Sequence, residues 1–272
     1  MKRSWFAYPY ALWMILFTIA PMIFVVYFAL TDAGGALTLE TLAAVGQSVY
    51  LKIFWHSLYL ALLCTAICLL LGYPAAYFLA SRDFSKNKTL FVLILLPMWM
   101  NFLLRTYAMM SLMEDTGIIN TFLKSIGLQP IQMIGTEGAV LVGMVYNFLP
   151  FMILPIHTSL KKMDQRVIEA AEDLGANPFE VFRRVTFPLS MPGVISGITM
   201  VFMPAVTTFA ISRLLGSGRF MLYGDVIEKQ FLELNNWNFG SSLSLVMMVL
   251  IIISIGLLNK ADSKQDQEGG NV

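Results

Sequence analysis

A charged segment between two strongly apolar ones, residues 169–193, reads EAAEDLGANPFEVFRRVTFPLSMPG. Its first six residues are compatible with a short helix, and Gly175 supplies a natural stop. Asn177 can cap a second helix, and the proline after it suits the first helical position, where no backbone donor is needed. We expect Pro188 and Pro192 to break the chain ahead of a new apolar span. The segment therefore predicts a helix, a turn and a second helix at a membrane surface.

The composition is that of a membrane protein. Of 272 residues, 57% are hydrophobic and 13% are charged, and the mean hydropathy is +0.71. Cys64 and Cys68 lie four apart in an apolar run, so we interpret them as small buried thiols on one helix face. The two histidines, His56 and His157, are far apart in the sequence. No metal site is predicted.

Six apolar segments are long enough to cross a bilayer, and prolines interrupt the second to the fifth of them, among others. The segments are residues 10–30, 57–80, 89–113, 138–160, 192–213 and 240–259. Prolines are tolerated in membrane helices when neighbouring helices satisfy the freed carbonyls, so they indicate either a pathway or simple structural kinks. The expected fold is one all-α integral membrane domain over 1–272, with six transmembrane helices, a cytoplasmic loop at 161–191 and a disordered tail at 260–272.

The N-terminus resembles a signal peptide in part, because Lys2 and Arg3 precede an apolar run. From residue 10 to residue 30, however, that run covers about 21 residues, which is enough to cross a bilayer. We therefore expect a retained first span. Cleavage at the small residues 33–36 is the alternative.

The distribution of Lys and Arg predicts the orientation. With the N-terminus inside, twelve of these residues face the cytoplasm and five face the other side, as the positive-inside rule requires. The twelve are Lys2, Arg3, Arg82, Lys86, Lys88, Lys161, Lys162, Arg166, Arg183, Arg184, Lys260 and Lys264; the five are Lys52, Lys124, Arg213, Arg219 and Lys229. Both termini and the 169–193 segment are thus predicted to be cytoplasmic.

The spacing within this segment resembles the EAA loop in the membrane subunits of bacterial ABC importers. That pattern has Glu-Ala-Ala, three residues, Gly, nine residues and Ile-x-Leu-Pro, and here Val replaces Ile and Phe replaces Leu. The matching residues are Glu169, Ala170, Ala171, Gly175, Val185, Phe187 and Pro188. The resemblance implies that the loop docks into a cleft on a separate ATP-hydrolysing subunit. An ordinary amphipathic cytoplasmic helix is the alternative interpretation.

A second resemblance covers nearly the whole chain after the first span. Residues 96–99 (LPMW), 105–108 (RTYA), 143–151, 203–209 and 214–216 resemble the B-type permease of spermidine/putrescine ABC importers. This implies a type I importer permease (MetI-like) fold, a heterodimer with a second homologous permease, two ATPase subunits, and an extracellular or periplasmic polyamine-binding protein.

One position departs from that family pattern. Relatives often carry an acidic residue before the Leu-Leu-Gly turn, whereas this chain has Arg213. If the acid contacts the delivery protein or a cationic substrate, the departure puts that contact in doubt. The other interpretation is a local change in an exposed loop, which is worth little energetically.

A polyamine pathway should offer carboxylates and aromatic faces for ammonium groups. The candidates are the aromatic residues Trp99, Tyr107 and Tyr146, the acids Glu114 and Asp115, the neutral hydrogen-bonding groups Asn101 and Asn147, and Arg105, which as a cation is a poor direct ligand for a polyamine. Each aromatic can equally belong to an interfacial belt or to the core. Arg105 lies within a predicted span, where insertion of an arginine costs roughly 2.5–3.5 kcal/mol, so we expect it to snorkel or to pair with Glu114 or Asp115.

The function predicted from the sequence is that of a permease subunit of an ATP-driven polyamine importer in the bacterial plasma (inner) membrane. The chain contains no GxxxxGK[ST] loop and no catalytic constellation, so we expect a non-enzymatic subunit. ATP and Mg²⁺ would be bound by partner ATPases, with no cofactor in this chain, and nucleic acid is not an expected partner. The alternatives are a permease for another small solute, a channel, or a secondary carrier that works alone.

Overall fold

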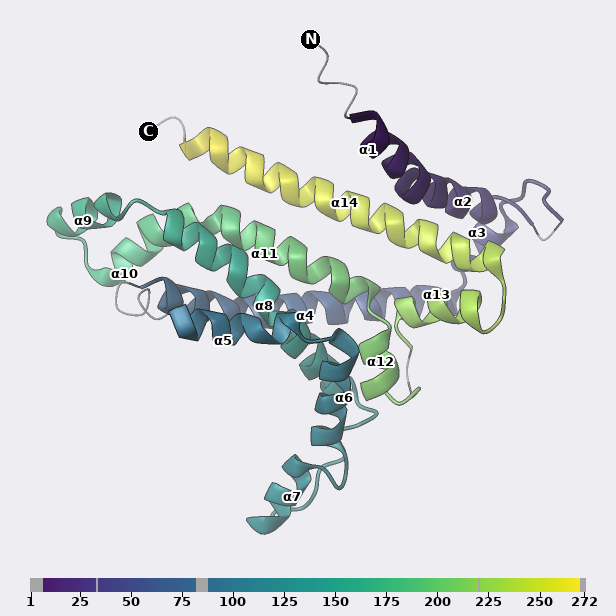
Figure 1. Ribbon diagram of the computed structural model, residues 1–272, viewed down its shortest axis with the longest axis horizontal. Coiled ribbons are helices and arrows are strands. Elements are labelled where there is room, and N and C mark those ends of the chain that lie inside the picture. Colours follow the sequence, from purple (N-terminus) through teal and green to yellow (C-terminus); the bar gives the residue numbers. More distant parts are fainter. Residues whose placement is uncertain (1–6, 33, 82–87, 220, 270–272) are drawn as a thin grey trace.

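A computed structural model of the chain describes residues 7–32, 34–81, 88–219 and 221–269, and most of these residues are helical. In chain order the elements, in which η marks a π-helical turn, are α1 (Ala7–Met14), η2 (Ile15–Ile19), α2 (Ala20–Ala29), α3 (Glu40–Val45), α4 (Ser48–Ala80), α5 (Lys88–Trp99), α6 (Phe102–Met113), α7 (Ile118–Ser125), α8 (Glu137–Lys162), α9 (Gln165–Asp173), α10 (Pro178–Val181), η3 (Phe182–Thr186), α11 (Phe187–Thr207), α12 (Ala210–Leu215), α13 (Tyr223–Leu232) and α14 (Trp237–Gly269). Figure 1 shows the long helices α4, α8, α11 and α14 running in roughly the same direction, with α9 and α10 at one end and α3 and α13 at the other.

The centre of the fold is the packing of α4, α8 and α11, which small residues bring close together. A Cβ atom added at Gly193 of α11 would lie 2.7 Å from the Pro155 carbonyl oxygen of α8. Added at Gly197, it would lie 2.8 Å from the Sδ of Met152, and added at Gly72 of α4 it would lie 2.9 Å from the Cγ of the same methionine. Met152 is fully buried. Any larger residue at these glycines would force the helices apart.

Among the residues that the structure describes, five helices are long and apolar enough to cross a membrane, and a bent pair of helices would make a sixth span. The five are Leu12–Ala29, Ser48–Ala80, Glu137–Lys162, Pro178–Thr207 and Trp237–Leu258. The all-α membrane class predicted from the sequence is confirmed, and five of the six predicted spans overlap one of these helices.

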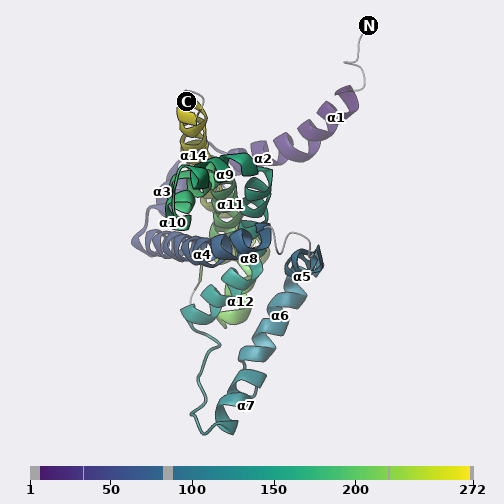
Figure 2. The same ribbon diagram turned by 90° about the vertical axis from the view of Figure 1, so that its left-hand side faces the viewer.

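The predicted third span, residues 89–113, is not one helix. It consists of α5 and α6: the segment Val92–Trp99 meets the segment Phe102–Ser125, which contains α6 and α7, at an angle of 103°. Pro97 removes a backbone donor in the last turn of α5. Asn101 then starts a new helix, because its side chain accepts from the backbone N–H groups of Leu103 and Leu104 at 2.9 and 3.3 Å. Figure 2 shows α6 and α7 extending away from the bundle.

The prediction that Pro188 and Pro192 break the chain is wrong, because α10, η3 and α11 form one continuous helix. The backbone N–H of Phe187 donates to the carbonyl of Phe182, five residues back. This wider π turn comes directly before Pro188 and accommodates a residue that has no donor. The same arrangement occurs in the first span, where a π turn precedes Pro21.

The boundaries of the predicted fifth span and of the loop before it also change. Residues 178–191, assigned to the loop, already belong to the helix that becomes the span. That helix ends at Thr207 and not at residue 213, because Thr208 is extended (ψ 141°) and α12 begins separately.

The first and last spans pack against each other. The Nδ2 of Asn238, at the start of α14, donates to the Thr31 carbonyl oxygen at 2.7 Å and to the Phe28 carbonyl oxygen at 3.2 Å. The end of α2 is thereby tied to the last helix, which Figure 1 shows alongside it.

The C-terminal tail differs from the prediction of disorder after residue 259, because α14 continues to Gly269. Residues 260–268 contain no proline or glycine, and most are good helix formers, so no local signal stops the helix before Gly269. Residues 270–272 lie outside the described residues, as do Lys2, Arg3, Ala33, Arg82 and Lys86, on which parts of the orientation and cleavage arguments rest.

Candidate functional site

The EAA segment forms a helix that ends in a glycine-based cap. Glu169, Ala170 and Ala171 lie in α9, and Gly175 follows it with φ +84°. The N–H of Gly175 donates to the Glu172 carbonyl at 2.9 Å, and the N–H of Ala176 donates to the Ala171 carbonyl at 3.1 Å. This pair of bonds is a Schellman motif, which needs a left-handed residue at the position of Gly175. The Glu-Ala-Ala-x₃-Gly spacing is therefore a structural unit, as the sequence predicted.

The next helix, α10, is capped at its N-terminus. Asn177 and Glu180 form a capping box: the Asn177 side chain accepts from the Glu180 N–H at 2.9 Å, and the Glu180 carboxylate accepts from the Asn177 N–H at 3.1 Å. Asp164 caps the start of α9 with a single bond, in which its side chain accepts from the Arg166 N–H at 3.0 Å. With both helices capped around the turn, α9 and α10 can move as one rigid piece.

The outer surface of this piece carries apolar side chains. Leu174 is 90% exposed and Phe179 is 69% exposed, while Glu169 and Ala170 lie on the surface and Ala171 is half-buried. Leu174 and Phe179 are not among the residues that the sequence motif points to. The signal that could have found them is the presence of two large apolar residues around a polar turn, where water alone would favour small polar ones.

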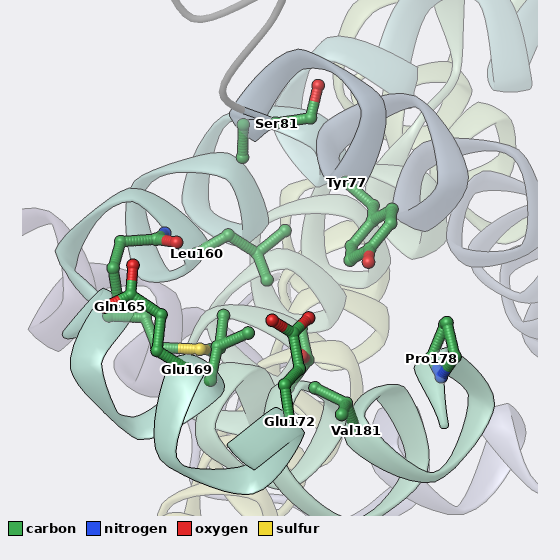
Figure 3. A pocket seen from close by; sticks show the side chains of 12 residues that line it. Tyr77, Ser81, Leu160, Gln165, Glu169, Glu172, Pro178 and Val181 are labelled. Atoms are coloured by element: carbon green, nitrogen blue, oxygen red, sulfur yellow. The ribbon is translucent and has the colours of Figure 1, made fainter. Parts of the chain in front are cut away.

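Behind this piece lies a pocket of about 300 Å³. It is lined by the ends of α4 and α8, by α9, and by the segment that leads into α11. Figure 3 shows the Glu172 carboxylate pointing into the pocket, with Tyr77 on another wall and Glu169 nearby. The pocket thus separates the capped loop from the membrane helix α4.

The remaining residues of the EAA pattern lie in the helix and not in the loop. Val185 is in the π turn η3 and is half-buried, whereas Phe187 and Pro188 begin α11, where both are exposed. The pattern therefore spans a capped turn and the π turn through which that turn joins the membrane helix.

The second part of the site is the break between α5 and α6. Trp99, the last residue of α5, is 83% exposed. Asn101, predicted to be a hydrogen-bonding group of the pathway, is instead the N-cap of α6, so its side-chain oxygen is already occupied. Tyr107 on α6 and Tyr146 on α8 are partly exposed, at 48% and 39%.

Arg105 does not pair with an acid as the sequence analysis expected. It is buried, with 4% exposed, and its Nε and Nη1 atoms have no hydrogen-bond partner among the described residues. Glu114 lies nine residues further along the chain, which corresponds to about 13 Å of helical rise, too far for the arginine side chain to reach. Glu114 and Asp115 are exposed at the far end of α6.

Asn147 ties α8 to α6 at the same level. Its Nδ2 donates to the Gly143 carbonyl at 2.9 Å and lies 3.4 Å from the Thr106 hydroxyl oxygen of α6. Its Oδ1 is buried and has no hydrogen-bond partner in the described part of the chain. Asn147 therefore makes the interhelical hydrogen bond that polar residues in membrane helices commonly make, and its partner Thr106 could not be identified from the sequence alone.

At the end of the bundle opposite α9 and α10, charged residues join α12 to α13. Arg213 contacts Glu228 at 2.6 Å and Glu233 at 3.7 Å. Nearby, burial raises the pKa of the Asp225 carboxyl to about 6, although hydrogen bonds from the Leu222 N–H and the Ser212 hydroxyl oppose the shift. Arg213 is thus held by two carboxylates of its own chain.

Cys64 and Cys68 are both free and fully buried, as predicted. Within the part of the chain that the structure describes, no three His, Cys, Asp or Glu side chains gather in a way that could hold a metal ion.

The sequence that forms this loop and most of these helices matches a known family. Residues 69–262 match the family described as "Binding-protein-dependent transport system inner membrane component". The chain belongs to this family. Like other members, this permease is a membrane subunit and not itself a catalyst.

Curated relatives of this permease include two with closely similar sequences. The spermidine/putrescine transport system permease protein PotB of Haemophilus influenzae is 38% identical over 258 residues, which cover 92% of this chain and 90% of that protein. The protein of the same name from Escherichia coli strain K12 is 36% identical over 247 residues, which cover 88% of this chain and 90% of that one.

Two solved structures share its fold. A chain of a bacterial alginate ABC transporter, solved with an alginate pentasaccharide-bound periplasmic protein, matches with a TM-score of 0.76 at 15% identity, covering 95% of this chain and 94% of that chain. A chain of the inward-facing MetNI methionine ABC transporter matches with a TM-score of 0.56 at 18% identity, covering 79% and 93%. The fold is therefore that of a MetI-like ABC importer permease, as predicted.

Proposed function

We propose that this permease is one of two homologous membrane subunits of an ATP-driven spermidine/putrescine importer in the bacterial inner membrane. The observation that carries the proposal is the match to the Haemophilus influenzae polyamine permease, which extends over 92% of this chain and 90% of that protein. A match of this extent includes the membrane helices as well as the loop. It therefore supports the proposed polyamine substrate as well as the proposed coupling to an ATPase.

The capped loop α9–α10 is the proposed contact with the ATPase. Its rigid caps, its exposed Leu174 and Phe179, and its accessible Glu169 suit insertion into a cleft lined by apolar and basic groups. The ATPase subunits bind ATP and Mg²⁺ and supply the hydrolysis. Closure of the ATPases moves the loop and shifts the permease between outward-open and inward-open states.

The orientation follows from this assignment. The loop end of the bundle carries the basic residues Lys161, Lys162, Arg166, Arg183 and Arg184, in agreement with the positive-inside rule. That end is cytoplasmic, and both chain termini lie on the same side. The opposite end, with α3 and α13, faces the polyamine-binding protein.

The substrate route passes the break between α5 and α6 and is completed by the second permease. Exposed aromatic faces at Trp99, Tyr107 and Tyr146 suit ammonium groups, and Glu114 and Asp115 add carboxylates at the outer end of α6. Broken membrane helices are a recurring way to build such a route. Arg105 is too buried to be a ligand, and as a cation it would repel one.

The proposal is tested by purifying the permease with its partners and reconstituting them in liposomes. Uptake of labelled spermidine or putrescine should require ATP, the ATPase and the binding protein, and unlabelled polyamine should compete with it. Competition by another solute but not by polyamines would point to a different cargo. Uptake by this chain alone, without an ATPase, would mean a channel or a secondary carrier and would overturn the proposal.

A further inference from the structure

Four aromatic side chains join α4 to the helix that leaves the capped loop. Tyr73 and Tyr77 lie one turn apart near the end of α4, and Phe182 and Phe187 lie at the two ends of the π turn. The ring centroids of Tyr73 and Phe182 are 5.9 Å apart, those of Tyr77 and Phe182 are 5.7 Å apart, and both pairs meet edge to face. Phe187 lies 5.7 Å from Tyr73 and 6.2 Å from Phe182. These four residues form a continuous aromatic cluster.

A buried hydrogen bond extends this cluster into α11. The hydroxyl oxygens of Tyr73 and Ser190 are 2.9 Å apart, and the Ser190 hydroxyl donates to the Phe187 carbonyl at 2.9 Å. Because the serine proton is used for that carbonyl, the tyrosine hydroxyl is the donor to Ser190. The end of α4 is therefore fixed to the first turn of α11 as well as to the π turn.

The position of the cluster matters because the backbone beside it is irregular. Between the loop and α11 the helix passes through the π turn and then Pro188, where the regular pattern of backbone hydrogen bonds is interrupted. A displacement of the loop could be absorbed by bending at this point. The aromatic cluster links the two ends of the π turn to each other and to α4 through contacts between its rings.

We propose that the aromatic cluster carries the displacement of the capped loop to α4, with Phe182 and Tyr73 as the positioning residues. This inference rests on the proposed function, since it assumes that the loop is moved by an ATPase. Within the cluster, the two positioning residues are set back from the surface that would meet the ATPase: Tyr73 is buried and Phe182 is half-buried behind the loop, whereas Tyr77 and Phe187 are 45% and 41% exposed. Loss of the cluster should therefore uncouple ATP hydrolysis from transport without detaching the ATPase.

The test compares two variants of the cluster with two matched controls at the other end of α4. Phe182→Leu removes the shared ring, and Tyr73→Phe removes only the hydroxyl that reaches Ser190. The controls are Phe54→Leu and Tyr223→Phe. Their rings form a comparable edge-to-face pair 5.2 Å apart, and the buried Tyr223 hydroxyl donates to the Leu243 carbonyl at 3.3 Å.

Four quantities are measured for each complex in liposomes: copurified ATPase, basal ATP hydrolysis, stimulation of hydrolysis by the substrate-loaded binding protein, and uptake of labelled spermidine. Phe182→Leu should keep the first two and lose roughly tenfold in stimulation and uptake, as expected when a coupling free energy is removed. Tyr73→Phe should show the same pattern with a smaller loss. The controls should stay within about threefold of the unsubstituted complex in all four.

Three results would overturn the inference and leave the proposed function standing. Uptake and stimulation by Phe182→Leu at the unsubstituted level would mean that the cluster carries no motion. Loss of copurified ATPase would assign the cluster to docking, and an equal loss in the controls would assign it to general packing; in both cases the proposed function would stand. If the unsubstituted permease itself neither retains an ATPase nor shows stimulated hydrolysis, the proposed function fails, and the inference fails with it.

Discussion

Gly175 allows the contact between the loop and the ATPase to be tested with one pair of isosteric substitutions. Its φ of +84° is left-handed, and a Cβ atom added there would meet no other atom within 4 Å. A substitution at this position therefore costs backbone strain within the chain but causes no clash. The two replacements that tolerate this conformation best are asparagine and aspartate.

Within the permease chain alone, the free-energy difference between the asparagine and aspartate variants is small. An ordinary residue in the left-handed region costs about 1–2 kcal/mol, and asparagine and aspartate cost less. The two differ by one charge at the C-terminal end of α9, where an acid is unfavourable by about 0.3–1 kcal/mol, a factor of at most about five in the population of the loop conformation. Contact with another protein is different, since an uncompensated buried charge costs about 3–5 kcal/mol, which exceeds a hundredfold.

Gly175→Asn and Gly175→Asp are therefore compared for uptake of labelled polyamine and for copurification of the ATPase, with membrane insertion of each variant checked by its yield in the membrane fraction. We expect both variants to insert normally. The asparagine variant should transport within about tenfold of the unsubstituted permease, and the aspartate variant should lose transport and ATPase together. Normal transport by Gly175→Asp would refute the assignment of this turn to the docked surface.

Three further substitutions test other parts of the account. Asn101→Ala removes the N-cap of α6 and should lower the stability of the α5–α6 junction by about 1 kcal/mol, measured as a lower thermal unfolding midpoint; an unchanged midpoint would contradict the capping role. Arg213→Ala breaks an exposed ion pair worth about 0.2–1 kcal/mol, so uptake should fall less than about fivefold, and a complete loss would assign Arg213 a direct role in transport. Burial raises the pKa of Asp225 from 3.8 to about 6, so between these values the folded state holds a proton that the unfolded state has lost. Stability contributed by this group should therefore fall as the pH rises from about 4 to about 6, and Asp225→Asn should reduce the change in thermal midpoint between pH 5 and pH 7.5, whereas an undiminished change would rule Asp225 out as its source.

Features set by neighbouring residues could be predicted from the sequence. Gly175 and Asn177 end and start helices through bonds to residues within five positions, and both assignments are confirmed. The apolar spans follow from composition, because the bilayer fixes the length that a helix must have. The buried thiols at Cys64 and Cys68 followed from their position in such a span.

Other features depend on geometry that composition does not encode. A hydropathy window over 89–113 averages the apolar residues. It carries no information on the Asn101 side chain, which accepts from the backbone and starts a new helix at 103° to the one before it. Pro188 reads as a break, but a π turn ahead of it lets the helix continue. Glu114 is only nine residues from Arg105 in the sequence, which suggested an ion pair. The rise of a helix separates the two residues by about 13 Å, so closeness in the sequence does not bring their side chains together.

The central claim is that the tip of the capped loop faces the cytoplasm and is covered there by an ATPase. Leu174→Cys places a thiol at a position that is 90% exposed, and the native Cys64 and Cys68 are fully buried, so a membrane-impermeant maleimide should report on the new thiol alone. We predict labelling in inside-out vesicles, protection when the ATPase is bound, and no labelling in intact spheroplasts. Labelling from outside, or labelling from inside that bound ATPase does not reduce, would contradict the account.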